Sequence, residues 1–398
     1  MTTAPRLGTL PLSPFRRLDR LLDGIAPGRP PILLSVGDPK GVPPPFVMEA
    51  IARAARDFGS YPQALGLAPL RESIASFLSR RFHLPQGMID SERHVLPVVG
   101  TREGLALALL CVLPDQPKER PAVLIPNPFY QCYAAAALSG GAEPIYVDAK
   151  PAQGFLPEFA QVPEEILRRT AALFICSPSN PEGAVADIAY WQKLFALSDR
   201  YGITIIADEC YSEVFDEDQA EAPIGALEAA NRSGRDLSRL IVFNSLSKRS
   251  SLPGMRSGLV AGHADFIAAY RDMRNYVGAT MPAPLQMASA AAWADEAHVR
   301  AMRQAHVARI NAAEKIFSNR HGFRRPPGGF FLWLDVGDGE GATRKLWREA
   351  GVKVLPGAYL AQTNAAGDNP AAAYIRIALV NELETTRAAL ERVGEVLG

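Results

Sequence analysis

The chain has 398 residues, of which 48% are hydrophobic and 21% charged, so its length favours two domains over one simple core. Lys plus Arg and Asp plus Glu number 42 each, and this balance gives no electrostatic reason to expect nucleic acid or an anionic membrane as a partner. The 4 cysteines lack the spacing of zinc ligands, and neither a signal peptide nor a membrane-spanning run is recognisable. We expect a cytoplasmic protein with reduced thiols and no metal site.

The N-terminal part of the chain predicts an arm, a first strand and several helices. Helices are expected at residues 14–23, at 45–58, and from 69 onward. The strand is expected at residues 32–36 and ends in the turn Gly37-Asp38-Pro39-Lys40. A strand that ends in this way can bring its backbone close to a ligand, so Gly37 is a candidate substrate-binding residue.

Between residues 95 and 261 the chain alternates short apolar runs with helical patterns. The runs are 122–125, 144–147, 171–175, 204–207 and 240–243. Such alternation is typical of βαβ units, so we expect an α/β fold with a mostly parallel central sheet flanked by helices.

Polar and aromatic segments follow several of these runs directly. The segments are 127–133 with Tyr130 and Tyr133, 177–183 with Asn180, 208–211 with Asp208 and Tyr211, and 244–258 with Lys248. The carboxyl ends of parallel strands meet at one edge of a sheet, where open α/β sheets bind their ligands. We therefore expect these side chains to surround a single site.

Lys248 is the candidate nucleophile of that site. It ends the motif Ser245-Leu246-Ser247-Lys248, whose serines can donate hydrogen bonds, and Arg256 downstream can clamp a dianion. A free lysine has a pKa near ~10.4, so forming a Schiff base requires desolvation or cationic neighbours. Alone, this motif would more often be a solvated surface loop, and only partners elsewhere in the chain favour the chemical interpretation.

Those partners suit a planar, phosphorylated ring that carries a proton. Gly100-Thr101-Arg102 opens a helix, and the exposed amides of a helix start favour phosphate. Asp208 can pair with a ring nitrogen, Tyr130 can stack, and Asn180 with Tyr211 can hydrogen-bond a phenolic oxygen. Each residue alone has an ordinary explanation as a cap, a turn or core, but their shared position after strands makes that explanation improbable for the set.

Beyond residue 282 the pattern changes to long helical stretches, about 285–320, followed by a strand near 330–335 and helices at 343–350 and 383–397. We predict an N-terminal arm at 1–44 that joins a smaller domain, a large cofactor-binding domain at 45–282, and the smaller α+β domain at 283–398. A small domain of this kind can close on a substrate and exclude water.

This set of residues resembles the fold-type I, pyridoxal-phosphate-dependent aminotransferases of class I and II over nearly the whole chain. The resemblance implies that Lys248 carries pyridoxal 5'-phosphate through a Schiff base and moves the substrate α-proton. The remaining cofactor contacts that it implies are Thr101, Arg102, Ser245 and Arg256 at the phosphate, Asp208 at the pyridine nitrogen, Tyr130 on the ring face, and Asn180 and Tyr211 at the ring oxygen. Ser247 is a further expected cofactor-binding residue.

The resemblance also implies a substrate site and an assembly. Arg376, in Tyr374-Ile375-Arg376-Ile377, would bind the substrate α-carboxylate, with Gly37, Tyr133, Asn180 and Phe330 as further substrate contacts. Tyr61 would reach the phosphate bound by a partner subunit, which implies a homodimer with shared active sites. Glutamate and 2-oxoglutarate are the expected amino donor and keto acid.

Within this superfamily the sequence is most similar to bacterial succinyl-diaminopimelate aminotransferases of lysine biosynthesis. The similarity lies in residues 36–40, 96–103, 247–258 and 293–299. Gly41 and Asn244 depart from that pattern, since a histidine is more usual at each place. Aspartate aminotransferases, aromatic aminotransferases and cysteine-conjugate β-lyases remain alternatives within the class.

Interpretations from other classes fit less well. A transcriptional regulator on this fold would carry an N-terminal helix-turn-helix, for which the Pro-rich arm before the first strand leaves too little room. An inactive structural homologue would tolerate loss of Lys248 or Asp208, and both residues are present.

Overall fold

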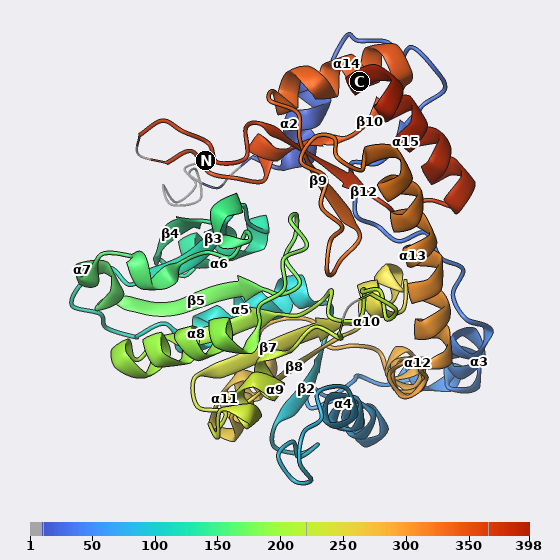
Figure 1. The fold of residues 1–398 in the computed structure, drawn as a ribbon. Coiled ribbons are helices and arrows are strands. Elements are labelled where there is room, and N and C mark those ends of the chain that lie inside the picture. The colour runs from blue at the N-terminus through green and yellow to red at the C-terminus, as the bar shows by residue number, and fades with distance from the viewer. Residues whose placement is uncertain (1–9, 11, 220, 365) are drawn as a thin grey trace, which may run out of the picture.

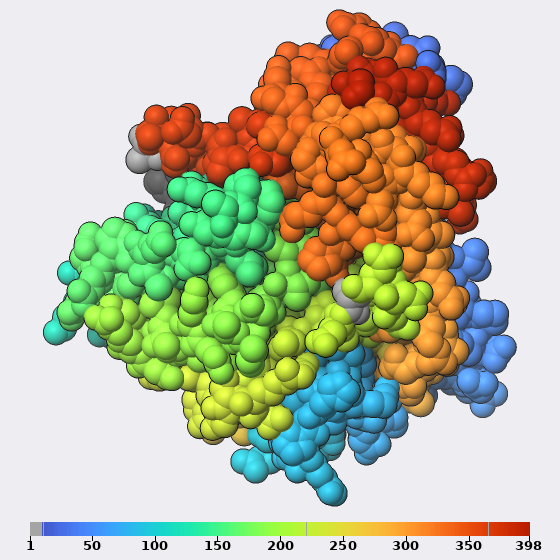
Figure 2. All heavy atoms as spheres, viewed as in Figure 1, coloured from blue at the N-terminus to red at the C-terminus, as the bar shows by residue number. Residues whose placement is uncertain are grey.

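The computed structural model describes residues 10, 12–219, 221–364 and 366–398. Figure 1 shows a large sheet with its helices in the lower part of the molecule and a small sheet with other helices in the upper part. The long helix α13 (Ala297–Phe317) runs between these two parts. In the space-filling view of Figure 2, the orange and red C-terminal segments form the upper part and the green and yellow segments the lower part.

The large sheet has seven strands within the described residues. Their order is β2 (Val95–Val98), β8 (Gly258–Gly262), β7 (Leu240–Ser245), β6 (Thr204–Asp208), β5 (Thr170–Cys176), β3 (Ala122–Asn127) and β4 (Glu143–Asp148). Pairing is parallel from β7 to β4, while β8 runs antiparallel to both of its neighbours. The predicted α/β fold with a mostly parallel sheet is confirmed.

Both faces of this sheet are apolar because successive residues of a strand point to opposite faces. On β5, for example, Leu173 and Ile175 belong to one buried cluster, whereas Ala172 and Phe174 belong to another. The first face is covered by α4 (Ala68–Arg81), α8 (Ile188–Tyr201) and α9 (Ala226–Arg232). The second is covered by α5 (Thr101–Val112), α6 (Gln131–Ser139) and α11 (Ala264–Arg274).

Local sequence signals fix the ends of α8, which lies between β5 and β6. The Asp187 carboxylate accepts a hydrogen bond of 2.7 Å from the Tyr190 amide at the N-terminus. Gly202 ends the helix with a φ of 74°, a left-handed conformation that glycine adopts without steric cost. This crossover helix returns the chain to the sheet for β6, which ends at Asp208.

Strands β2 and β8 were absent from the runs predicted from the sequence. Pro97 lies within β2 and two glycines bound β8, and both residue types argue against a strand when the sequence is considered alone. In the structure β2 is the edge strand, so Pro97 can pair with Leu259 without interrupting an inner ladder.

The upper part contains a small antiparallel sheet in the order β11 (Leu355–Pro356), β12 (Tyr374–Ala378) and β9 (Phe331–Asp335). Beside it, β1 (Ile32–Leu33) pairs in parallel with β10 (Val352–Lys353). Helices α2 (Pro14–Leu21), α14 (Gly339–Ala350) and α15 (Leu383–Leu397) pack around these strands. The N-terminal arm therefore joins the C-terminal part of the chain through β1 and α2.

The predicted division into an arm (1–44), a large domain (45–282) and a small domain (283–398) stays a prediction. Helix α12 (Ala283–Ala294) lies at the start of the predicted small domain. It packs against α4 and α3 (Pro45–Arg53), and Ala288 and Trp293 belong to the buried cluster of the large sheet. This packing favours a boundary at Asp295, where α12 ends. Within the described ranges, no helix has the length and apolar character needed to cross a membrane.

A buried ion cluster ties α13 to the large sheet. The Glu213 carboxylate, 1% exposed, pairs with Arg81 at the end of α4 and with Arg303 of α13, the latter at 2.6 Å. Burial alone would raise the pKa of Glu213, but the two guanidinium groups outweigh burial and lower it. The carboxylate is therefore ionised at neutral pH and holds two segments far apart in sequence.

Glu213→Gln should destabilise the protein because it leaves two largely buried guanidinium groups without their shared negative charge. We expect the free energy of unfolding to fall by about 3 kcal/mol, measured as a lower thermal midpoint. Glu49→Gln is the control, since the Glu49–Arg53 pair at 3.9 Å is solvent-exposed, and its effect should stay within about 0.5 kcal/mol. Equal midpoints for the two variants would contradict this role of Glu213.

Candidate active site

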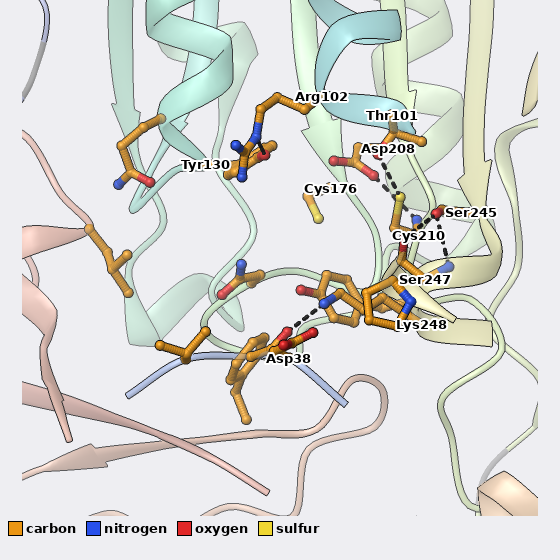
Figure 3. A pocket seen from close by; sticks show the side chains of 18 of the residues that line it. Asp38, Thr101, Arg102, Tyr130, Cys176, Asp208, Cys210, Ser245, Ser247 and Lys248 are labelled. Atoms are coloured by element: carbon orange, nitrogen blue, oxygen red, sulfur yellow. Dashed lines mark hydrogen bonds between the residues drawn. The ribbon is translucent and has the colours of Figure 1, made fainter. Parts of the chain in front are cut away.

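A cavity of about 350 Å³ lies at the carboxyl ends of the parallel strands, between the large sheet and the small one. The predicted site residues that line it are Gly37, Thr101, Arg102, Tyr130, Tyr133, Asn180, Asp208, Tyr211, Ser245, Ser247, Lys248, Arg256 and Arg376. Figure 3 shows Lys248 on one side of this cavity, with Tyr130 and Asp208 on the other. Segments separated by hundreds of residues therefore meet at one edge of the sheet, as the sequence predicted.

Two predicted site residues lie outside this cavity wall. Phe330 stands behind it, with its ring centroid 5.4 Å from Lys248 Nζ, and the adjacent Phe331 lines the cavity instead. Neighbouring residues of an extended chain point in opposite directions, so only one of the two can face the cavity. Tyr61 is fully exposed on the surface, away from the cavity of its own chain.

Lys248 lies in the short helix α10 (Leu246–Arg249), directly after β7. Ser245 caps this helix by accepting a hydrogen bond of 3.0 Å from the Ser247 amide. The lysine Nζ donates to the backbone oxygen of Gly37, which follows β1. Burial lowers the pKa of Lys248 to about 8, and Arg376 and Arg256 add to the effect, although Cys210 and Asp38 oppose it. The amine is thus far closer to a nucleophilic state than an exposed lysine.

Asp208 ends β6 and is 5% exposed. Its Oδ2 accepts a hydrogen bond of 2.8 Å from the Tyr133 hydroxyl, and its Oδ1 accepts one of 3.3 Å from the Cys210 amide. Both donors are neutral, and burial raises the pKa of the Asp208 carboxyl despite them. A cationic N–H group beside Asp208 would supply the charge that favours its ionised form.

Hydroxyl and guanidinium groups gather near the N-terminus of α5. Ser245 Oγ lies 2.9 Å from Ser247 Oγ, and Arg256 approaches Gly100 so closely that a Cβ there would be 2.0 Å from Arg256 Nη2. Gly100 also has a φ of 75°, a left-handed conformation that glycine adopts without steric cost. Hydroxyls, a guanidinium and helix amides together match the needs of a phosphate group.

Neighbouring side chains fix the orientation of the Tyr130 ring. Arg102 Nε donates a hydrogen bond of 2.6 Å to the Tyr130 hydroxyl, which fixes the phenol ring at the cavity wall. The ring of Tyr133 meets it edge-on, with centroids 5.6 Å apart. A flat aromatic face held in this way is suited to stacking on a planar ligand.

Arg376 in β12 brings a buried positive charge to the opposite wall. Its Nη1 donates to Asn180 Oδ1 at 2.9 Å, and its Nη2 donates to the Ser35 backbone oxygen at 2.7 Å. Both acceptors are neutral, and burial lowers the pKa of Arg376 to about 10. A carboxylate in the cavity would meet an unneutralised guanidinium whose planar geometry suits bidentate binding.

Some residues of the wall were not predicted from the sequence. Asp38 and Phe15 line the cavity, and Cys210 does so with its Sγ 3.2 Å from Thr101 Oγ1. Cys210 had a usable signal, because it lies in the segment 208–211 that directly follows the apolar run 204–207. Phe15 had none, since its place depends on how the N-terminal arm folds back over the sheet.

The cavity satisfies the requirements of one kind of cofactor. In a phosphorylated aromatic aldehyde with a protonated ring nitrogen, the phosphate would suit the hydroxyl, guanidinium and amide groups near the N-terminus of α5, and the ring would suit the face of Tyr130. The ring nitrogen would suit the Asp208 carboxylate, and the aldehyde would suit the Lys248 amine. Pyridoxal phosphate is such a molecule. The fold and the cavity together place the chain among the enzymes that depend on pyridoxal phosphate.

Comparisons with known proteins agree with this class. The family model described as Aminotransferase class I and II matches residues 29–393. A curated LL-diaminopimelate aminotransferase from Maridesulfovibrio salexigens is 30% identical over 405 residues, covering 99% of this chain and 98% of that protein. The chain therefore belongs to the class I and II aminotransferase family and is a pyridoxal-phosphate-dependent transaminase that acts on amino and keto acids.

Solved structures show the same fold along the whole chain. An aminotransferase from Neisseria meningitidis has a TM-score of 0.94 and 38% identity, covering 99% of this chain and 100% of that one. A probable N-succinyldiaminopimelate aminotransferase from Thermus thermophilus has a TM-score of 0.81 and 25% identity, covering 96% and 100% of the two chains. The predicted fold type is confirmed by these similarities.

The lowered pKa of Lys248 should be measurable in the cofactor-free protein. Labelling with a trace acylating reagent across a pH series, followed by peptide mass spectrometry, should give half-maximal reaction of Lys248 near pH 8. The same lysine in urea-unfolded protein is the control and should follow its ordinary pKa of 10.5. If the folded and unfolded curves coincide, burial does not activate this amine.

Proposed function

We propose that this protein transfers the amino group of glutamate to a keto acid with a succinylated diaminopimelate skeleton, in lysine and diaminopimelate biosynthesis. The observation that supports amino transfer is that the partly buried Lys248 and the buried Arg376 guanidinium line one cavity. The substrate class is supported by the similarity of residues 247–258 and 293–299 to succinyl-diaminopimelate aminotransferases. It is also supported by the similarity of the fold to that of the probable N-succinyldiaminopimelate aminotransferase from Thermus thermophilus.

LL-Diaminopimelate without the succinyl group is the second candidate substrate. Curated relatives from several bacteria carry the name LL-diaminopimelate aminotransferase at 28–30% identity. The two candidates differ at the end of the molecule that does not react. LL-Diaminopimelate carries an ammonium group there, whereas the succinylated compound carries an uncharged amide and an additional carboxylate. Aspartate, aromatic amino acids and cysteine conjugates are the remaining alternatives.

Pyridoxal phosphate, when bound, supplies an electron sink for the carbanion that forms when the α-proton is lost. We propose that Lys248 holds the cofactor and moves that proton, and that Asp208 keeps the ring nitrogen protonated. Tyr130 stacks on the ring. The other proposed cofactor contacts are Ser245, Ser247, Arg256, Thr101 and Arg102 at the phosphate and Asn180 and Tyr211 at the ring oxygen.

Arg376 would fix the substrate α-carboxylate and thereby its reacting carbon. Its contact with Asn180 links the carboxylate site to the residue proposed for the ring oxygen, so one guanidinium orients both. Gly37 and Tyr133 are proposed as further substrate-binding residues. Phe331, which lies under the guanidinium at 4.3 Å and lines the cavity, fits the role that was predicted for Phe330.

A substrate panel tests the proposal directly. The purified holoenzyme would be assayed in the glutamate-forming direction with 2-oxoglutarate and, in turn, N-succinyl-LL-diaminopimelate, LL-diaminopimelate, aspartate and phenylalanine, and for pyruvate release with a cysteine conjugate. We expect the highest kcat/KM with the succinylated compound. A higher value with free LL-diaminopimelate would favour the second candidate, and preference for any other member would contradict a diaminopimelate substrate.

Asp208→Asn should leave the cofactor bound but slow the reaction, because the amide cannot supply the charge that keeps the ring nitrogen protonated. We expect kcat to fall by about 10²-fold or more, as for loss of one preorganised electrostatic group. Asp187→Asn is the control, because it changes the N-cap of α8, which does not line the cavity, to a residue that caps equally well. A near-normal kcat for Asp208→Asn would refute the pairing.

The exposed Tyr61 tests whether active sites are shared in a homodimer. We expect Lys248→Ala to be inactive and Tyr61→Ala to be weakened, because the tyrosine would serve the partner's phosphate site. After subunit exchange, one site of each heterodimer carries both changes and the other carries neither. Activity of the mixture should therefore exceed the sum of the parents; failure to do so, with exchange verified by mass, would show that Tyr61 does not act across an interface.

A further inference from the structure

The position of Lys248 depends on residues outside the active-site cavity. Helix α10 spans only Leu246–Arg249, and a helix of a single turn is not stable by itself. The two residues that follow the lysine, Arg249 and Ser250, are both buried. Each is bound to the joint between α12 and α13, where the chain passes from the large sheet to the small one.

Arg249 is bound to the C-terminal end of α12. Its side chain is fully buried and donates hydrogen bonds to the backbone oxygens of Ala292 at 2.8 Å and Asp295 at 3.2 Å. The last carbonyl groups of a helix have no donor within the helix, so the guanidinium satisfies them. It also pairs with the Glu296 carboxylate at 2.8 Å, which offsets its buried charge.

Ser250 is bound to the N-terminal end of α13 through a chain of three side chains. Ser250 Oγ lies 2.8 Å from His298 Nε2, and His298 Nδ1 lies 2.5 Å from Asp295 Oδ1. The same Asp295 oxygen accepts a hydrogen bond of 2.9 Å from the His298 amide and so satisfies one of the free amides in the first turn of α13.

The direction of this chain follows from its chemistry. Burial lowers the pKa of His298, although Asp295 opposes the effect, so the ring is neutral at neutral pH. The Asp295 carboxylate can only accept, so Nδ1–H donates to it and Nε2 accepts from the Ser250 hydroxyl. Serine hydrolases use the same three residue types for catalysis, and their serine must reach a substrate carbonyl. Ser250 is only 4% exposed, so its burial argues against a role as a hydrolase nucleophile.

Helix α13 carries this attachment to the small sheet. His306 Nε2 lies 2.9 Å from the Gly329 oxygen, just before β9, and Arg309 donates a hydrogen bond of 2.6 Å to the Asn381 oxygen, just after β12. A second cavity of about 340 Å³ is lined by Lys248, Ser250, His298, His306 and Arg309. One rigid helix thus contacts both the segment of Lys248 and the sheet that contains Arg376.

We propose that Ser250, His298 and Asp295 are positioning residues for amino transfer: their hydrogen-bond chain holds Lys248 at a fixed distance from the strand of Arg376. The proposal rests on the proposed role of Lys248. It accounts for a Ser–His–Asp chain that begins at the buried Ser250, two residues after the reactive amine, and for the position of this chain between the two sheets. The alternative is that these three residues only stabilise the ends of the helices and do not affect the position of Lys248.

The test compares Ser250→Ala, His298→Ala, the double variant and His298→Gln, which keeps an acceptor near Ser250. The control is Ser251→Ala, the adjacent serine at the same second cavity. The first measurement is kcat and KM of the holoenzyme with its best substrate. We expect kcat to fall about tenfold or more for each alanine variant with little change in KM, no further loss in the double variant, and partial recovery in His298→Gln.

The second measurement needs neither cofactor nor turnover. In cofactor-free protein, the pH at which Lys248 is half labelled should rise from about 8 toward 10.5 in the alanine variants, because the displaced amine becomes solvated. The titratable groups that face it, namely Asp38, Cys210, Arg256 and Arg376, are unchanged in every variant. Absence of amino transfer in the wild type would refute the proposed function while this measurement still tests the positioning role.

The proposal would be overturned if the variants lowered only the thermal midpoint and left both kcat and the Lys248 labelling curve unchanged. It would also be overturned if the two single effects added in the double variant, because residues in one hydrogen-bond chain act as a unit. An equal effect of Ser251→Ala would show that the cavity lining, and not the chain, is responsible.

Discussion

The burial of one lysine amine is the constraint on which the rest of the structure depends. An exposed lysine is protonated at neutral pH and cannot attack a carbonyl carbon, so the fold must remove Lys248 from water without pairing it to a carboxylate. The parallel sheet does this by ending β7 directly before the lysine, while the N-terminal arm brings Gly37 over the amine. The resulting pKa near 8 is the physical basis of the chemistry.

The two other charged groups of the cavity are buried in a complementary way. Asp208 has a raised pKa and Arg376 a lowered one, and the hydrogen-bond partners of each are neutral. Folding therefore leaves a carboxyl group and a guanidinium group in the cavity wall, neither of which has an oppositely charged hydrogen-bond partner. A cationic ring nitrogen and a substrate carboxylate supply those charges, so ligand binding recovers free energy that folding alone does not.

Sequence predicts this site well where chemistry follows directly from a strand end. Lys248, Asp208 and Asn180 each come after an apolar run, and parallel pairing alone brings them together. Prediction fails where tertiary packing decides, because no short-range pattern encodes it. Examples are the choice of Phe331 over Phe330, the edge strand β2 with Pro97, and the attachment of α12 to the large sheet. The contact between Ser250 and His298 joins residues 48 positions apart and was equally invisible.

The most direct test of the role of Lys248 is to identify the residue that binds the cofactor covalently. The holoenzyme would be reduced with borohydride, digested and analysed by peptide mass spectrometry, so that a Schiff base becomes a stable adduct. We predict the pyridoxyl phosphate mass on the peptide that contains Lys248 and on no other lysine peptide. An adduct on a different lysine, or an enzyme that transaminates without any adduct, would contradict the central role of Lys248.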